Sequence, residues 1–149
     1  MVDYDDWGEK PVPAIDPESE PYWEAASDGE LALQHCADCG EWQFYPRTLC
    51  RHCWSRDPAF EPVAGTATVH SHTRCHTPGQ PGYGEETPYT VALVELDLPT
   101  ENPSGRAVRL TTHVDCPDDA IEIGLPVAVS FERVGEDENE VFLPVFVPR

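Results

Sequence analysis

The chain has 149 residues, 40% of them hydrophobic, and a formal net charge of −19. This length allows one domain with a real core, or a small module beside a compact domain, and the 14 Trp, Tyr and Phe rings exclude a wholly disordered chain. Only nine Lys and Arg oppose 28 Asp and Glu, which disfavours binding to nucleic acid or to an anionic membrane surface.

Residues 1–18 are acidic and rich in proline, and we expect an extended arm there. The arm is either a loose tail or a segment that wraps a partner, with Trp7 as its anchor. Residues 19–30 predict a short helix that starts near Ser19 and ends at Gly29. Its apolar patch around Tyr22 and Trp23 is expected to pack on the domain, with an interface as the alternative.

Two Cys-x-x-Cys pairs, ten residues apart, lie within residues 31–60. One pair alone would also suit a redox disulfide, but two such pairs predict a tetrahedral structural metal site in a zinc ribbon. Four thiolates leave no open coordination position, so the site should not be catalytic. The predicted ligands are Cys36, Cys39, Cys50 and Cys53; zinc is the expected ion, and iron is the alternative.

Each pair needs a tight turn behind its second cysteine. Gly40 occupies that position in the first turn and suits a left-handed backbone, whereas Trp54 occupies it in the second and leaves the geometry open. Four thiolates and one Zn²⁺ carry a charge of −2. Three nearby arginines either offset this charge or are ordinary solvated side chains. These arginines are Arg47, Arg51 and Arg56.

The other histidines and cysteines carry no strong pattern. His52 is not needed as a ligand, and His35 should lie beside the metal turns or at the surface. His70 and His72, two apart on an expected strand, should share a face; a second metal site there is conceivable, but polar residues on a wet face are favoured. The two remaining cysteines, Cys75 and Cys116, are expected to be small, partly buried hydrophobes.

Beyond Pro58 the pattern changes to short strands separated by turns rich in Gly and Pro. One strand should place Ala67, Val69 and Ser71 on one face. We also expect a long loop over 77–86, a helical turn over 116–120 and an acidic hairpin turn over 135–140. The strands are expected over 65–73, 89–98, 107–114, 126–134 and 141–147.

Five strands over residues 61–149 match an OB barrel, and a small antiparallel barrel or sandwich is the alternative. The predicted fold is therefore mostly β: a short N-terminal helix and a four-cysteine zinc ribbon, followed by a five-stranded OB-fold barrel. No phosphate-binding loop, dinucleotide fingerprint or nucleophile elbow is present, so we expect no catalytic residues. No stretch reaches the ~20 apolar residues of a membrane span, and the acidic N-terminus lacks a signal core, so a cytoplasmic protein is expected.

The order of these parts resembles a known family, the acyl-CoA-associated rubredoxin-like zinc ribbon plus OB-fold proteins. The resemblance covers residues 20–147 and is specific through the combination of its pieces, each of which is weak alone. Arg51 departs from the family pattern, which often has Pro there. The matching pieces are the run from Leu31 to Gly40, Tyr45-Pro46-Arg47, the second Cys pair, Gly65-Thr66, Pro88-Tyr89, the strand from Val91 to Leu96, and Ile123-Gly124-Leu125-Pro126-Val127.

The resemblance implies a function that composition does not. Such proteins accompany thiolase-like enzymes and lack catalytic residues, so the chain is expected to be an accessory subunit of an acyl-CoA aldolase, a carbon–carbon lyase of steroid side-chain degradation. The implied partner is the thiolase-like subunit, in a heterotetramer with two of each chain. An independent acyl-CoA or lipid-binding module is the alternative, and a nucleic-acid binder is a third, which the charge disfavours.

Overall fold

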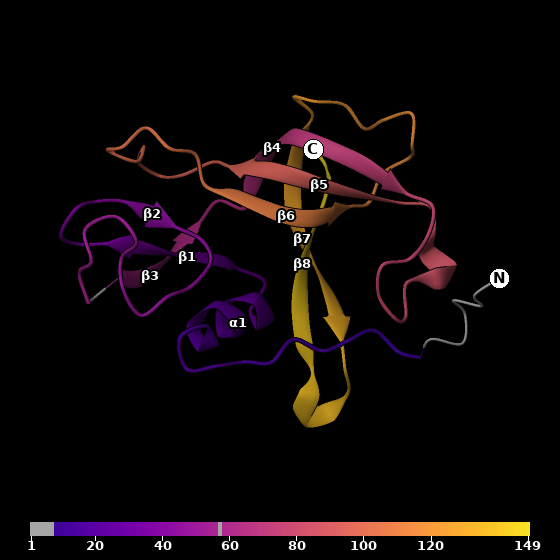
Figure 1. The fold of residues 1–149 in the computed structure, drawn as a ribbon, viewed down its shortest axis with the longest axis horizontal. Coiled ribbons are helices and arrows are strands. Elements are labelled where there is room, and N and C mark those ends of the chain that lie inside the picture. The colour runs from indigo at the N-terminus through magenta and orange to yellow at the C-terminus, as the bar shows by residue number, and fades with distance from the viewer. Residues whose placement is uncertain (1–7, 57) are drawn as a thin grey trace.

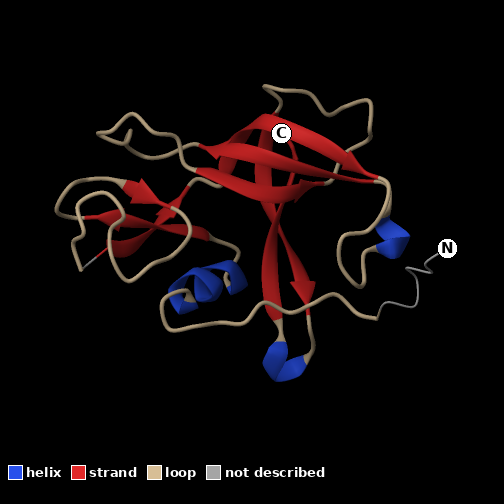
Figure 2. Ribbon diagram, in the orientation of Figure 1, coloured by secondary structure: helices blue, strands red, loops and turns tan. Residues whose placement is uncertain are grey.

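A computed structural model gives the fold and describes residues 8–56 and 58–149. The proposed anchor Trp7 therefore lies outside the described residues. A small three-stranded sheet and a closed five-stranded barrel lie side by side, and helix α1 packs beneath them (Figure 1). Strands make up most of the regular structure (Figure 2). The mostly-β architecture predicted from the sequence is confirmed.

Helix α1 spans Glu20–Ser27, with Ser19 at its N-cap. Pro21 fits the first turn because its missing N–H would have no partner within the helix. At the other end Gly29, with φ of +79°, donates its N–H to Ala26 O, and Glu30 donates to Ala25 O. This pair of bonds is the Schellman motif that ends many helices. Tyr22 is buried, as the predicted packing role requires.

The small sheet has the order β2-β1-β3, and all of its pairings are antiparallel. Strand β1 (Leu31–Cys36) is central, β2 (Trp42–Gln43) is short, and β3 (Pro58–Val63) pairs with the whole of β1. The sequence analysis did not expect β3, because two of its six residues are prolines. An edge strand tolerates them, since one of its sides needs no ladder bonds. Strand β3 also crosses residue 60, where the sequence analysis divides ribbon from barrel; that division stays a prediction.

The barrel closes in the order β4-β5-β6-β8-β7, with β7 returning to β4. All neighbours are antiparallel except β6 and β8, which are parallel. This is the five-stranded OB arrangement, and it confirms the predicted fold class. The strands are β4 (Thr66–Cys75), β5 (Tyr89–Leu96), β6 (Arg109–Val114), β7 (Pro126–Val134) and β8 (Val141–Pro148).

A β-bulge in β4 corrects one prediction. Val69 pairs with Val94 but Ser71 pairs with Leu93, so His70 is an extra residue in the ladder. The extra residue reverses the alternation beyond it. Ser71 therefore does not share the buried face of Val69, and His70 and His72 point to opposite faces rather than the same one.

The connections are mostly turns. The expected loop over 77–86 ends in a 3₁₀ turn, Gly84–Glu86, and the acidic β7–β8 hairpin contains another, Asp137–Asn139. Residues 118–120 form a turn closed by the bond from Ala120 N–H to Pro117 O, at 2.9 Å, rather than the predicted helical turn. A single hydrogen bond over so few residues does not offset the cost of nucleating a helix.

The described part of the arm, residues 8–18, lies against its own barrel and crosses β7 and β8 (Figure 1). Lys10 fastens it: Lys10 Nζ lies 2.9 Å from Glu86 Oε2, forms an ion pair with Glu132, and sits 4.7 Å from the centre of the Tyr83 ring. The cation–π contact and the two carboxylates hold the arm along this wall of the barrel.

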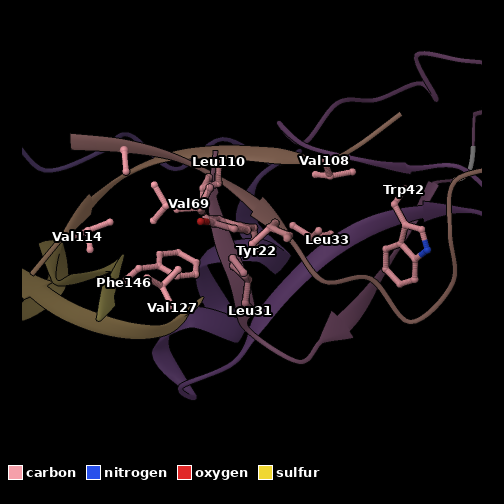
Figure 3. Packing of buried hydrophobic residues seen from close by; sticks show 14 residues of the cluster. Tyr22, Leu31, Leu33, Trp42, Val69, Val108, Leu110, Val114, Val127 and Phe146 are labelled. Carbon is pink, nitrogen blue, oxygen red and sulfur yellow. The ribbon is translucent and has the colours of Figure 1, made fainter. Parts of the chain in front are cut away.

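One hydrophobic core joins the two parts (Figure 3). Helix α1 and the small sheet contribute large side chains that pack on the same cluster as the barrel interior, so the ribbon is not a loosely tethered module. The members labelled in Figure 3 are Tyr22, Leu31, Leu33, Trp42, Val69, Val108, Leu110, Val114, Val127 and Phe146.

A polar contact adds to this core. The loop between β5 and β6, residues 97–108, which we call the clasp loop, inserts Asn102 against β2. Asn102 Oδ1 accepts from Trp42 N–H at 2.6 Å, while its Nδ2 donates to Trp42 O at 3.2 Å and to Arg106 O at 2.9 Å. Thr100 Oγ1 accepts from the Trp42 ring N–H at 3.0 Å, and Glu41 accepts from Ser104 N–H at 2.6 Å.

Candidate metal centre

Two backbone turns of the same design carry the cysteines. In the first, Gly40 N–H donates to Cys36 O at 2.8 Å; in the second, Trp54 N–H donates to Cys50 O at 2.9 Å. Both closing residues are left-handed, with φ of +78° at Gly40 and +67° at Trp54. The geometry that the sequence left open at Trp54 is therefore the same as at Gly40, although a side chain makes it costlier there.

The turns bring the four sulfurs together. Cys36 Sγ lies 3.6 Å from Cys53 Sγ, Cys39 Sγ lies 3.6 Å from Cys50 Sγ, and all four lie within 4.8 Å of one another. A tetrahedral zinc with Zn–S bonds of ~2.3 Å would hold its sulfurs about 3.8 Å apart. The donor set and its spacing therefore fit one tetrahedral ion, and the four cysteines are positioned for metal binding.

Electrostatics around the sulfurs favours a cation. Burial, together with hydrogen bonds among the neighbouring thiols, raises the pKa of Cys39 to about 12. Burial acts the same way on Cys36, but backbone N–H groups of Cys39 and Asp38 donate to its sulfur and bring its pKa down to about 7. Thiols this close cannot all ionise without a positive ion between them, and such an ion would deprotonate them together.

Two buried glutamines hold the loop that leads to the second pair. Gln34 and Gln43 lie opposite each other on β1 and β2, and Gln43 Nε2 donates to Gln34 Oε1 at 2.6 Å. Gln34 also receives from Arg47 N–H at 2.9 Å and donates to Arg47 O at 2.7 Å. Gln43 Oε1 receives from Arg51 N–H at 2.9 Å. The sequence analysis missed both residues; paired amides at facing strand positions beside the cysteines were the available signal.

Models of two consecutive domains match the chain. Residues 23–59 match "ChsH2, rubredoxin-like zinc ribbon domain", and residues 60–132 match "ChsH2, C-terminal OB-fold domain". A DUF35 domain-containing scaffold protein of Methanothermobacter thermautotrophicus is 33% identical over 112 residues, which are 74% of this chain and 77% of that one. The chain belongs to the DUF35 family. The resemblance stated from the sequence is thereby confirmed.

Solved structures agree with this DUF35 assignment. A chain of the Ltp2-ChsH2(DUF35) aldolase superposes with a TM-score of 0.71 and 37% identity, covering 91% of this chain and 98% of that one. A DUF35-family protein of unknown function from Sulfolobus solfataricus shares the fold, with a TM-score of 0.56 and 15% identity over 77% of this chain and 78% of that one.

A longer relative also matches the DUF35 chain. The "Probable enoyl-CoA hydratase alpha subunit" of Thermomonospora curvata is 39% identical over 140 residues, which are 93% of this chain but 40% of that protein. The chain thus spans less than half the length of this relative.

The histidines near the cysteines have other contacts. His35 stacks on Trp42, with ring centres 4.1 Å apart, and its ring nitrogens contact Glu61 and Gly40 O, the latter at 3.1 Å. His52 is exposed, and its backbone N–H donates to Cys50 Sγ at 3.4 Å. His35 thus contacts the DUF35 ribbon through its ring and His52 through its backbone N–H.

The remaining candidates are dispersed. His70 Nδ1 lies 3.4 Å from Glu95, and the bulge turns His72 away from it. Cys75 and Cys116 are half-buried, as expected. Among the described residues, the four ribbon cysteines are the one group of His, Cys, Asp and Glu side chains placed to share a metal. The same described part of this DUF35 chain has no helix with the length and apolarity needed to cross a bilayer.

A groove of about 490 Å³ lies at one end of the barrel, and the sequence analysis did not predict it. His113 lies on its wall, stacked on Tyr89 with ring centres 4.7 Å apart, and burial lowers the pKa of His113. Arg74 is a cation in the groove and donates to Thr90 Oγ1 at 2.8 Å. Three carboxylates line it as well: Glu86, Asp115 and Glu132.

Proposed function

We propose that this chain is a non-catalytic accessory subunit of a thiolase-like aldolase that acts on an acyl-CoA. The structural ion would fix the ribbon, and the ribbon and barrel together would present a rigid surface to the enzyme subunit. The predicted ligands Cys36, Cys39, Cys50 and Cys53 would hold that ion; zinc is the expected ion and iron the alternative, since four tetrahedral thiolates suit either.

One observation carries the proposal. The chain aligns with 98% of a chain from the solved Ltp2-ChsH2(DUF35) aldolase at 37% identity, so the similarity extends across both the ribbon and the barrel. Family membership and the scaffold-protein name of the Methanothermobacter relative support the same role.

The finer parts of the proposal follow the same analogy. The reaction would be retro-aldol cleavage of a steroid side-chain β-hydroxyacyl-CoA in the cytoplasm. This chain would stabilise the enzyme subunit and help to shape its acyl-CoA channel, in a heterotetramer of two plus two chains.

Co-expression tests the proposal. A thiolase-like aldolase subunit co-expressed with this chain should be soluble and cleave a β-hydroxyacyl-CoA, whereas the same subunit expressed alone should be insoluble or inactive. The isolated chain should have no such activity. An enzyme subunit that is equally soluble and active on its own would overturn the accessory role.

A second candidate, an independent acyl-CoA or lipid-binding module, is favoured by the groove at the barrel end. Two of its three carboxylates, Glu86 and Glu132, are paired with Lys10, and Arg74 is the one cation in its lining. The groove therefore offers little positive charge to the phosphates of CoA, and an acyl chain would be the part bound there. Titration of acyl-CoA into the isolated chain separates the two functions, because an accessory subunit should take up little or none.

A further inference from the structure

The charge of the chain is divided unevenly. Residues 42–56 contain no Asp or Glu and carry Arg47, Arg51 and Arg56, whereas the other 134 residues carry all 28 acidic side chains and only six Lys and Arg. All three arginines of this stretch are exposed. With the metal bound, the −2 charge of four thiolates and one Zn²⁺ offsets two of these three positive charges, but within this stretch every exposed charged side chain is an arginine.

A groove of about 620 Å³ lies on the surface of this stretch, and we call it the knuckle groove. Arg47, Leu49, Arg51 and Trp54 line it. The one carboxylate in its lining, Glu18, is hydrogen-bonded to Thr48 Oγ1. The groove thus pairs two guanidinium groups with apolar surface, and Leu49 and Trp54 remain exposed beside them.

Trp54 is the least expected residue of the groove. Its side chain is 78% exposed, and its backbone has φ of +67°, a conformation that strains any residue with a Cβ. The equivalent residue of the first turn is Gly40, which adopts φ of +78° without that strain. An exposed ring on a strained backbone does not stabilise the ribbon, so a role outside the chain accounts for it better.

We propose that the knuckle groove docks the thiolase-like subunit, through a surface of that subunit on which carboxylates surround an apolar side chain. This inference rests on the proposed function and names the docking face. Trp and Arg are the residue types that dominate binding energy at protein interfaces, and the guanidinium fork matches a carboxylate bidentately. On a chain of −19, the exposed guanidinium groups of the groove favour an acidic occupant and steer its approach.

Two variants of the metal-loaded chain test the inference against the co-purified thiolase-like subunit. Trp54→Gly should unfold at a higher denaturant concentration than the wild type, because the strain is relieved, and yet bind the subunit about thirtyfold more weakly or worse. The double variant Arg47→Glu/Arg51→Glu should associate more slowly, and added salt should slow the wild type in the same direction. Ile123→Ala, at an exposed barrel residue, is the control and should bind normally.

Each contrary result overturns the inference. Normal subunit binding by both groove variants, with metal content unchanged, would remove the docking role and leave the proposed function intact. The same holds if the variants abolish binding of CoA alone, or self-association of this chain, while the subunit still binds. A wild-type chain that forms no complex with the subunit would overturn the inference together with the proposed function.

Discussion

Gln43 is a buried amide whose hydrogen bonds reach both Gln34 and the turn that carries Cys50. Replacing it by Ala would leave Arg51 N–H and Gln34 Oε1 without this partner. We expect Gln43→Ala to lower the free energy of unfolding by about 1–3 kcal/mol and to release the bound ion faster to a chromophoric chelator. Thr48→Ala, at the exposed side of the same loop, is the control; equal release rates in the two variants would contradict the positioning role.

Tyr22 provides a prediction for alkaline pH. Burial, with a smaller contribution from Tyr45, raises the pKa of Tyr22 above its ordinary value of 10.0. The folded state thus favours the neutral phenol, and the stability that depends on it is present below pH 10 and is lost as the pH rises further. Denaturant titrations should show that the free energy of unfolding of Tyr22→Phe rises relative to that of the wild type only above pH 10. A difference in free energy that stays constant from pH 7 to 12 would contradict this.

The cysteines show what single residues reveal. Their spacing predicted the four candidate ligands, because two short turns with thiols at fixed offsets leave few other geometries. The left-handed backbone of Trp54 was not predictable, since local sequence preference assigns that conformation to Gly. The knuckle groove with its exposed arginines was missed as well, because net charge averages over the whole chain.

At the scale of elements, periodicity predicted the five barrel strands, and the structure departs from it where a local exception intervenes. The prolines of β3 hid an edge strand whose partner, β1, lies more than twenty residues earlier. His70 inserts a bulge that an alternating pattern cannot reveal. The clasp loop was predicted only as a turn, since its contact with the ribbon is made by Asn102 to Trp42, sixty positions earlier in the sequence.

That loop yields a prediction of its own. Asn102→Ala removes three hydrogen bonds, two of them to Trp42 of the ribbon, and should lower the free energy of unfolding by about 2 kcal/mol. It should also separate the unfolding of the ribbon, followed by tryptophan fluorescence, from that of the barrel, followed by far-ultraviolet circular dichroism. Coincident transitions in the variant would show that the apolar core alone couples the two parts.

At the scale of the whole molecule, the ion and the core contribute different kinds of stability. Structural zinc in small ribbons supplies about 10–16 kcal/mol at neutral pH. The purified chain should therefore contain one ion per molecule by mass spectrometry. Chelation should unfold the ribbon and also lower the denaturation temperature of the barrel, because both parts pack on one core. Cys36→Ser should lose the ion and Cys75→Ser should keep it; equal metal content in the two would contradict the assigned site.

The joint between the two parts is short. Strand β3 ends at Val63 and β4 begins at Thr66, and Gly65 O accepts from Val129 N–H at 2.7 Å. A Cβ on Gly65 would lie 2.5 Å from Val129 Cγ1, and the φ of Gly65 is +76°, so a larger residue there would displace that side chain and strain the backbone. This short joint and the shared core limit rotation of the ribbon relative to the barrel. A partner protein bound to the ribbon would therefore also fix the orientation of the barrel.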